Sequence, residues 1–337
     1  MSTEKQPEHD ELIHIGPEMA VAEADVHPEE GAFVRGTSLW RDAWRRLLKN
    51  KLAVFGLVVV IVVTIASIIG PTVIQKVFGF TPDYIPTHDD KLTRSFPPFT
   101  GPDGAFSPLH PMGTDNAGRD QLARVLQGGQ ISLFIGILST VVSLLIGVSY
   151  GAIAGYVGGR VDNLMMRIVD VLYSLPYIIL VIVLLSLFRS QTPRGQLTLL
   201  FIAIGSVSWL TMARIVRGQI LSLKNQEFVL AARATGVSAS RIIFRHLVPN
   251  TLGPVIVYAT LTIPQIMLTE AFLSFLGFGV QAPLASWGTL AADGITNIAV
   301  FPWQLIFPGA TMALTLFSLN FLGDGLRDAL DPQMRTI

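Results

Sequence analysis

The residue types that commonly carry chemistry occur in this sequence without the spacing that such chemistry requires. The chain has no cysteine, so it offers no thiol nucleophile and no cysteine metal ligand. Its six histidines form no His-Glu-x-x-His pattern and no other paired ligand spacing. There is no glycine-rich phosphate loop of the Gly-x4-Gly-Lys type, and no nucleophile stands beside a base. We therefore expect no catalytic residue, metal site, cofactor or ATP-binding site in this chain.

Two acidic residues lie inside long apolar segments, where an ionised side chain at the centre of a membrane helix costs about 2.5–3.5 kcal/mol. Arg167 precedes Asp170 by one helical turn, so an internal ion pair that holds helices together is expected there. Glu270 has no base near it in the sequence. Two interpretations stay open for Glu270: it faces a polar translocation path, or it packs by a hydrogen bond against a helix of a partner subunit.

The segment Gly113–Asp120 carries acidic residues that invite comparison with a calcium loop. It lacks the spacing and the closing glutamate of an EF-hand, so calcium binding is not expected. Gly113 and Gly118 suit a tight turn, and Asp115 and Arg119 suit a local ion pair that shapes this turn.

The composition indicates a membrane protein. Half of the 337 residues are hydrophobic and only 14% are charged, against about a quarter charged in soluble domains. The formal net charge of zero argues against a nucleic-acid-binding protein, which needs a basic face. Residues 1–30 hold nine acidic residues and one lysine. We therefore interpret 1–37 as a disordered acidic tail, which is also unlike a signal peptide.

Six segments are long and apolar enough to cross a membrane, which requires about 20 mostly apolar residues. The second contains glycines at helical spacing, which would let a neighbouring helix approach closely. The fold class is therefore predicted to be an all-α membrane protein with six transmembrane helices. The predicted spans are 52–75, 130–157, 164–188, 196–213, 253–277 and 300–323.

Lysine and arginine in the loops set the expected orientation. The stretch before the first span and the loop at 214–252 are both basic, whereas the loop at 278–299 has no lysine or arginine. This predicts that both termini and the 214–252 loop are cytoplasmic. In 38–51, apolar residues recur at helical spacing with arginines on the other face, which predicts an interfacial amphipathic helix. The alternative is a simple basic flank that stops transfer.

The loop at 214–252 is much longer than a connection between two spans requires. Its pattern predicts a helix that ends at Gly236, where a left-handed backbone costs glycine little. A second short helix follows, which Ser238 or Ser240 can cap and Pro249 can end. A compact helix pair of small side chains in the cytoplasm indicates a docking element for a soluble partner.

The segment that contains Ala231, Ala232, Gly236 and Pro249 resembles the coupling motif of ABC importer permeases. Leu230 departs from that motif, which has glutamate at this position. The segments Trp44–Leu52, Gly113–Asp120, Glu270–Gly279 with Ser286–Gly288, and Asn320–Pro332 are similar, in the same order, to dipeptide and oligopeptide permeases of the C type. The resemblance covers about residues 40 to 332 and omits the acidic tail.

This resemblance implies a permease subunit of the bacterial inner membrane with no ATPase site of its own. Its implied partners are a second homologous permease, two subunits that bind ATP and magnesium, an extracellular binding protein, membrane lipid and a peptide substrate. Nickel complexes and glutathione are alternative substrates within the family. A secondary transporter is a less favoured alternative, because it would leave the docking loop unexplained. The implied docking residues are Ala231, Ala232, Gly236, His246 and Pro249. The outer loop implied to face the binding protein contains Asp115, Arg119 and Trp287.

Overall fold

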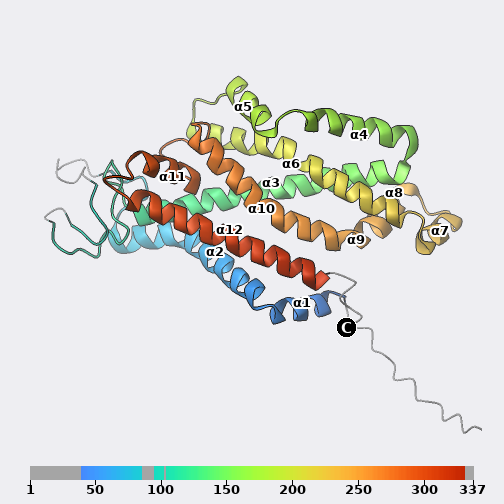
Figure 1. Ribbon diagram of the computed structural model, residues 1–337, viewed down its shortest axis with the longest axis horizontal. Coiled ribbons are helices and arrows are strands. Elements are labelled where there is room, and N and C mark those ends of the chain that lie inside the picture. The colour runs from blue at the N-terminus through green and yellow to red at the C-terminus, as the bar shows by residue number, and fades with distance from the viewer. Residues whose placement is uncertain (1–38, 86–94, 102–103, 331–337) are drawn as a thin grey trace, which may run out of the picture. The chain divides into compact units, whose positions relative to one another are not determined.

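The computed structural model describes residues 39–85, 95–101 and 104–330. These residues are almost entirely helical, and the extended pairing among them is limited to two isolated β-bridges (Figure 1). Five helices are long and apolar enough to cross a membrane, and a bent pair makes a sixth crossing if it counts as one span. The predicted all-α membrane fold is confirmed. The predicted tail at 1–37 lies outside the described residues.

The first two helices, α1 (Leu39–Lys49) and α2 (Lys51–Phe78), meet at a single-residue turn. Asn50 caps α2, because its side-chain oxygen accepts hydrogen bonds from the backbone N–H groups two and three residues later, at 3.1 and 3.2 Å. Leu47 of α1 is buried in a small apolar cluster with Ala329 near the other end of the chain. A helix is therefore present where the sequence predicts one at 38–51, and it packs on the membrane helices.

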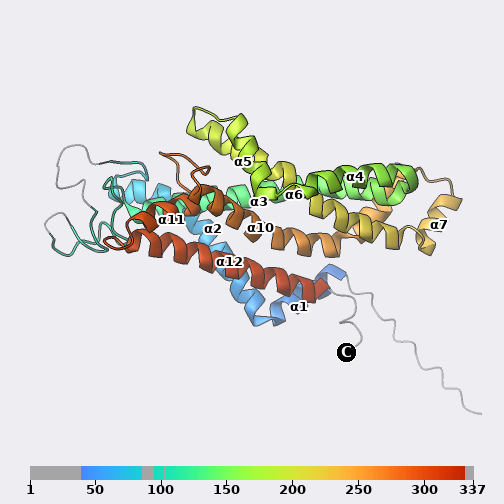
Figure 2. The same ribbon diagram turned by 45° about the horizontal axis from the view of Figure 1, so that its top comes forward.

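The longest helices, α3 (Gln121–Val157) and α6 (Pro193–Leu223), lie side by side (Figures 1 and 2). Three glycines of α3 face α6, and a Cβ atom added to any of them would lie 3.0 Å or less from atoms of α6. Glycine therefore lets the two backbones approach closely, as the spacing predicts. These residues are Gly147, Gly151 and Gly155.

Both helices extend beyond the predicted spans at 130–157 and 196–213. The first begins early because Asp120 caps it, accepting a hydrogen bond from the Ala123 N–H at 2.7 Å. The second continues through Arg214 and Arg217 to Leu223, residues that hydropathy assigns to a loop. Both arginines are paired with acids of a neighbouring helix, and this pairing lets charged residues continue a packed helix.

The span predicted at 164–188 is not one continuous helix. It is two helices, α4 (Gly159–Ser174) and α5 (Tyr177–Leu187), which are bent by 82° where they meet. Pro176 lies in the break, and proline both lacks an N–H donor and disfavours helical backbone in the residue before it. Leu175 accordingly adopts an extended conformation with ψ of 135°.

The last membrane helices are α10 (Leu252–Phe275) and α12 (Trp303–Leu330). Between them lies α11 (Trp287–Thr296), inside the stretch 278–299 where the sequence predicts a loop. Ser286 and Thr289 form a reciprocal capping box at the start of α11.

The segment between α6 and α10 is a run of short helical pieces: α7 (Glu227–Ala234), α8 (Ala239–Arg241), a π-helical turn (Ile242–Leu247) and α9 (Val248–Asn250). In both ribbon views α7 and α11 lie at opposite ends of the long helices (Figures 1 and 2). These ends are called the α7 end and the α11 end below.

Candidate functional site

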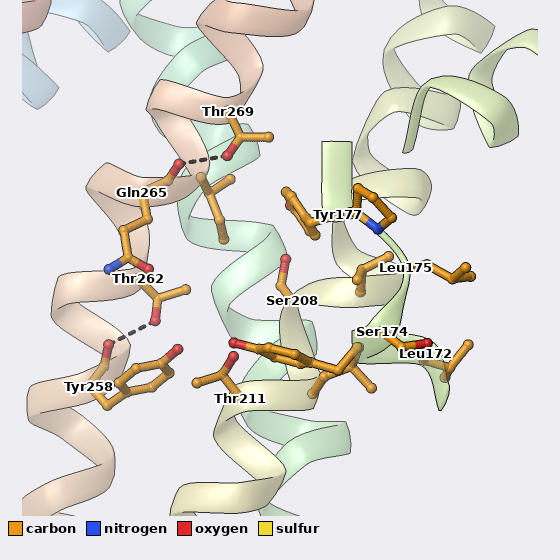
Figure 3. A pocket seen from close by; sticks show the side chains of 15 residues that line it. Leu172, Ser174, Leu175, Tyr177, Ser208, Thr211, Tyr258, Thr262, Gln265 and Thr269 are labelled. Atoms are coloured by element: carbon orange, nitrogen blue, oxygen red, sulfur yellow. Dashed lines mark hydrogen bonds between the residues drawn. The ribbon is translucent and has the colours of Figure 1, made fainter. Parts of the chain in front are cut away.

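A cavity of about 470 Å³ opens where α4 and α5 meet, walled by α6 and α10 (Figure 3). In Figure 3 the α10 side chains Thr269, Gln265, Thr262 and Tyr258 follow one another down one wall. Of the described residues that line the cavity, none is acidic, basic or a histidine. The polar side chains of the lining include Tyr177, Ser208, Thr211, Tyr258, Thr262 and Gln265.

The hydroxyl groups in this lining are neutral and partly satisfied by their own helices. Thr262 donates to the carbonyl of Tyr258 at 2.8 Å, and Thr269 donates to the carbonyl of Gln265 at 2.9 Å. Each hydroxyl oxygen can still accept a hydrogen bond, and an amide such as that of Gln265 can both donate and accept. The cavity therefore suits an uncharged, hydrogen-bonding solute.

Two ion pairs join α4 to α6 on the α7 side of the cavity. Arg217 donates two hydrogen bonds to Asp162, at 2.5 and 2.7 Å. Arg214 donates one hydrogen bond to Asp170 at 2.7 Å. The predicted ion pair of Asp170 is present and joins two helices, but its partner is Arg214 and not Arg167, because sequence spacing identifies partners only on the same helix.

The segment predicted to dock a partner forms a short helix that is held at one side. Val229 of α7 is fully buried, and Ala232 packs half-buried against the same apolar cluster. Phe228, on the same helix, is 41% exposed. The helix ends as predicted at Gly236, with φ of 76°. The N–H groups of residues 236 and 237 return to the carbonyls of residues 233 and 232, at 3.0 and 3.1 Å, which is a Schellman motif.

The predicted docking residues differ in exposure. Ala231, Gly236 and Pro249 are exposed, whereas Ala232 and His246 are half-buried. Two large apolar side chains, Leu230 and Phe244, are each 49% exposed in the same segment. Sequence reasoning missed Phe244, although an isolated aromatic residue in a basic loop is a signal that could have identified it. Ser238 starts the second helical piece as predicted, but its side chain makes no capping hydrogen bond.

At the α11 end, the turn predicted at Gly113–Asp120 is present and closed by its own bonds. Asp115 accepts from the backbone N–H groups of residues 117 and 119, at 2.9 Å each, and from the side chain of Arg119 at 2.7 Å. It also pairs with Arg124 of α3, whose side chain is only 5% exposed. The predicted Asp115–Arg119 pair is confirmed. Sequence reasoning missed Arg124, because its partner lies nine residues away across a turn.

Two of the residues predicted to face a binding protein are buried. Trp287 has no exposed surface, and its indole N–H donates to the carbonyl of Val125 at 2.8 Å. Asp115 is 7% exposed. Both side chains therefore hold this end of the chain together, and the contact of this outer loop with a binding protein stays a prediction. Arg119, with 15% of its side chain exposed, borders two small cavities beside α11.

Glu270 is buried inside its own chain, 1% exposed. Its carboxylate accepts hydrogen bonds from Ser274 at 2.7 Å and from Ser286 at 2.6 Å, and Ser132 of α3 lies at 3.5 Å. It does not line the cavity between α6 and α10. Its hydrogen bonds join α10 to the cap of α11 within this chain, where a bond to a partner helix was the alternative; a place in the translocation path stays a prediction.

Comparison with known proteins identifies the family of this chain. Residues 147–336 match the family described as "Binding-protein-dependent transport system inner membrane component", and residues 38–98 match the "N-terminal TM domain of oligopeptide transport permease C". The chain belongs to this family of inner-membrane transport components. It is thus a multi-pass membrane protein and a subunit of a transport system.

Three relatives are similar in sequence to this chain over nearly its whole length. The oligopeptide transport system permease protein OppC of Bacillus subtilis is 44% identical over 93% of this chain and 96% of its own. OppC of Haemophilus influenzae is 47% identical over 90% of this chain and 91% of its own. The dipeptide permease DppC of Bacillus subtilis is 42% identical over 98% of this chain and 97% of its own. The resemblance to C-type peptide permeases is confirmed.

A solved structure of the MetNI methionine ABC transporter in inward-facing conformations aligns with a TM-score of 0.48. It is 17% identical, and the alignment covers 61% of this chain and 96% of that one.

Proposed function

We propose that this chain forms half of the translocation path of a peptide importer. A second homologous permease supplies the other half, two separate subunits bind ATP and magnesium, and an extracellular binding protein delivers the peptide. The names of the relatives described above, oligopeptide and dipeptide permeases, support this substrate class. This chain has no ATPase role in the proposal.

The observation that carries the proposal is the neutral polar cavity at the break between α4 and α5. A peptide presents a repeating series of N–H donors and C=O acceptors, and each loses its water when it enters a protein. Hydroxyl and amide groups replace those bonds without selecting a side chain. Small-molecule sites commonly combine apolar walls with a few such polar groups. A lining of this kind accepts peptides of varied sequence.

The second element of the proposal is transmission from the ATP-binding subunits. Only three residues separate α6 from α7, so a displacement of α7 is passed directly to the helix that walls the cavity. The exposed apolar side chains of α7 and its neighbours form the docking surface: Phe228, Leu230 and Phe244. The path has two states, inward-open and outward-open. The closed ATP-binding subunits contact one of these states more favourably, and this difference in contact shifts the path to that state. In the proposed importer, the α7 end and both termini are cytoplasmic.

A reconstituted complex tests the proposal. The subunits that copurify with the chain in mild detergent are placed in liposomes, and ATP-dependent uptake of a labelled tripeptide, glutathione and a nickel–histidine complex is compared. Peptide uptake is expected. Uptake of only glutathione or nickel would overturn the substrate assignment.

The docking element is tested with Gly236→Trp in the same complex. A Cβ atom added there meets no atom within 4 Å, so the tryptophan side chain has room to project from the docking surface, although the left-handed backbone is strained by any side chain. Uptake and substrate-stimulated ATP hydrolysis should both collapse while the protein still inserts. Gly79→Trp is the matched control, because Gly79 also ends a helix with φ of 77° and open space around it. Unchanged coupled transport in Gly236→Trp would contradict the docking role.

A further inference from the structure

Arg214 makes two contacts that meet at the cavity. Its guanidinium donates to Asp170 at 2.7 Å, and its central carbon lies 4.1 Å from the centre of the Tyr173 ring. Tyr173 is itself a lining residue of the cavity. The ion pair with Asp170 holds the Arg214 guanidinium in place. The guanidinium in turn makes a cation–π contact with the Tyr173 ring.

These contacts lie at the α7 end of the cavity. On α6 the lining runs from Val207 to Thr211, and Arg214 follows one turn later toward α7. In Figure 3 Thr211 lies below Ser208, level with the region of Tyr258 at the lower end of the α10 wall. Tyr173 is thus the lining residue that Arg214 contacts on the α7 side of the cavity.

The two ion pairs between α4 and α6 differ in strength. The Asp162–Arg217 pair is bidentate, and the carboxylate side chain is 9% exposed. The Asp170–Arg214 pair has a single hydrogen bond, and its side chains are 65% and 39% exposed. Exposed single-bond pairs contribute little to stability, whereas bidentate pairs are among the strong ones. The first pair is suited to persist through a transport cycle, and the second is suited to break and re-form.

Resting on the proposed function above, we propose that Arg214 is a positioning residue that holds Tyr173 across the cytoplasmic mouth of the peptide path. When α7 displaces α6, the Asp170–Arg214 pair separates and the ring is released, while the Asp162–Arg217 pair keeps α4 attached to α6. The mouth of the path then opens without α4 detaching. The latch consists of Asp170, Tyr173 and Arg214.

Cysteine accessibility tests this latch, since the native chain has no cysteine. Ser208→Cys places a near-isosteric thiol in the cavity lining. The assembled complex in inside-out vesicles is treated with a charged, membrane-impermeant thiol reagent, which reaches the cavity from the cytoplasmic side. Adding Arg214→Gln should raise the labelling rate about tenfold, the bias that an exposed ion pair and one cation–π contact give together. Tyr173→Leu should raise it similarly.

The matched control is Arg217→Gln, which breaks the other pair between the same helices without touching a lining residue. It should raise labelling far less than Arg214→Gln. Rescue by the conservative variant distinguishes positioning from general loosening: Arg214→Lys keeps a cation for both Asp170 and the Tyr173 ring, so its labelling rate should stay near the starting value. Equal labelling in the native, Arg214→Gln and Arg217→Gln backgrounds would overturn the latch, and so would equal increases in the two variants.

Peptide uptake separates failure of the latch from failure of the path. Uptake by the Ser208→Cys complex is measured before and after the thiol is modified. If modification blocks uptake but Arg214→Gln leaves the labelling rate unchanged, the cavity is the path and the latch is wrong. If modification leaves uptake intact, the cavity is not the path and the latch is overturned, while the assignment to peptide import stands. If the unmodified complex takes up no peptide, the proposed function itself is overturned.

Discussion

The two ends of this membrane protein are built on opposite principles. At the α11 end, Asp115, Glu270 and Trp287 are buried, and each makes hydrogen bonds to groups of the same chain. At the α7 end, Val229 anchors a short helix while Phe228 beside it is 41% exposed. The charged and polar groups of the α11 end are satisfied within the chain, whereas the α7 end exposes large apolar side chains on a short helix that is proposed to dock.

The difference has an energetic reason. A buried charge is tolerated only when its partners are in place, so the α11 end has to satisfy its own polar groups before it can pack. An exposed cluster of large apolar side chains marks an interaction surface. Substitutions at the α11 end should therefore act on stability, and substitutions at the α7 end on coupling.

Asp115→Ala should have the largest effect on stability. It leaves Arg119 and the buried Arg124 without their carboxylate partner, and breaking a buried pair costs about 3–5 kcal/mol. Thermal unfolding of the purified chain in detergent, followed by tryptophan fluorescence, measures the loss. Asp170→Ala is the matched control, because its pair is exposed and contributes about 0–1 kcal/mol. Equal losses in the two variants would remove the distinction between the buried and the exposed pair.

Gly151→Ala should have the next largest effect. The added methyl group would overlap the backbone carbonyl of Ala213 in α6, and such overpacking costs about 1–3 kcal/mol. Gly218→Ala is the control in the partner helix, where an added Cβ meets nothing within 4 Å. There the change should stabilise the helix by up to about 1 kcal/mol, because alanine favours helix over glycine. A loss of stability in both variants would contradict close packing as the cause.

The sequence predicted the helical elements well, because hydropathy and glycine spacing report on single helices. It predicted their ends and breaks poorly. Pro176 was visible in the sequence, but a proline inside an apolar segment is compatible with a kinked helix as well as with an 82° break. The helix α11 was missed because its ten residues are too few to span a membrane.

The site was predictable where it depends on local geometry and not where it depends on tertiary pairing. Gly236 was identified because a left-handed helix end has its own sequence signal. The partners of Asp170 and Glu270 could not be found, because Arg214 and Ser286 lie 44 and 16 residues away in the chain. The cavity was missed for the same reason, since its threonines, serines and tyrosines are unremarkable in each helix and meet only in the fold.

Phe228→Ala should impair docking while leaving stability within about 0.5 kcal/mol, as for most surface substitutions. Large apolar residues at the centre of an interface contribute more than about 1 kcal/mol each to binding, so the affinity for the ATP-binding subunits should fall about tenfold. Titration of these subunits onto the detergent-solubilised permease pair measures it. Phe106→Ala is the control, since Phe106 is 79% exposed in the loop between α2 and α3. An equal loss of affinity in the control would show that α7 is not the docking site.

Glu270→Gln should have the smallest effect, and it sharpens the contrast between a structural carboxylate and one in a path. Glutamine keeps a side-chain oxygen that can accept from Ser274 and Ser286, and its amide can donate to Ser132, so the loss of stability should stay below about 1 kcal/mol. Glu270→Leu leaves buried hydroxyl groups unsatisfied and should cost about 1–3 kcal/mol. Peptide uptake should fall only in proportion to the amount of folded complex in both variants. A glutamine variant that retains its unfolding temperature but loses uptake would place Glu270 in the path after all, because only a solute that meets the charge would detect the exchange.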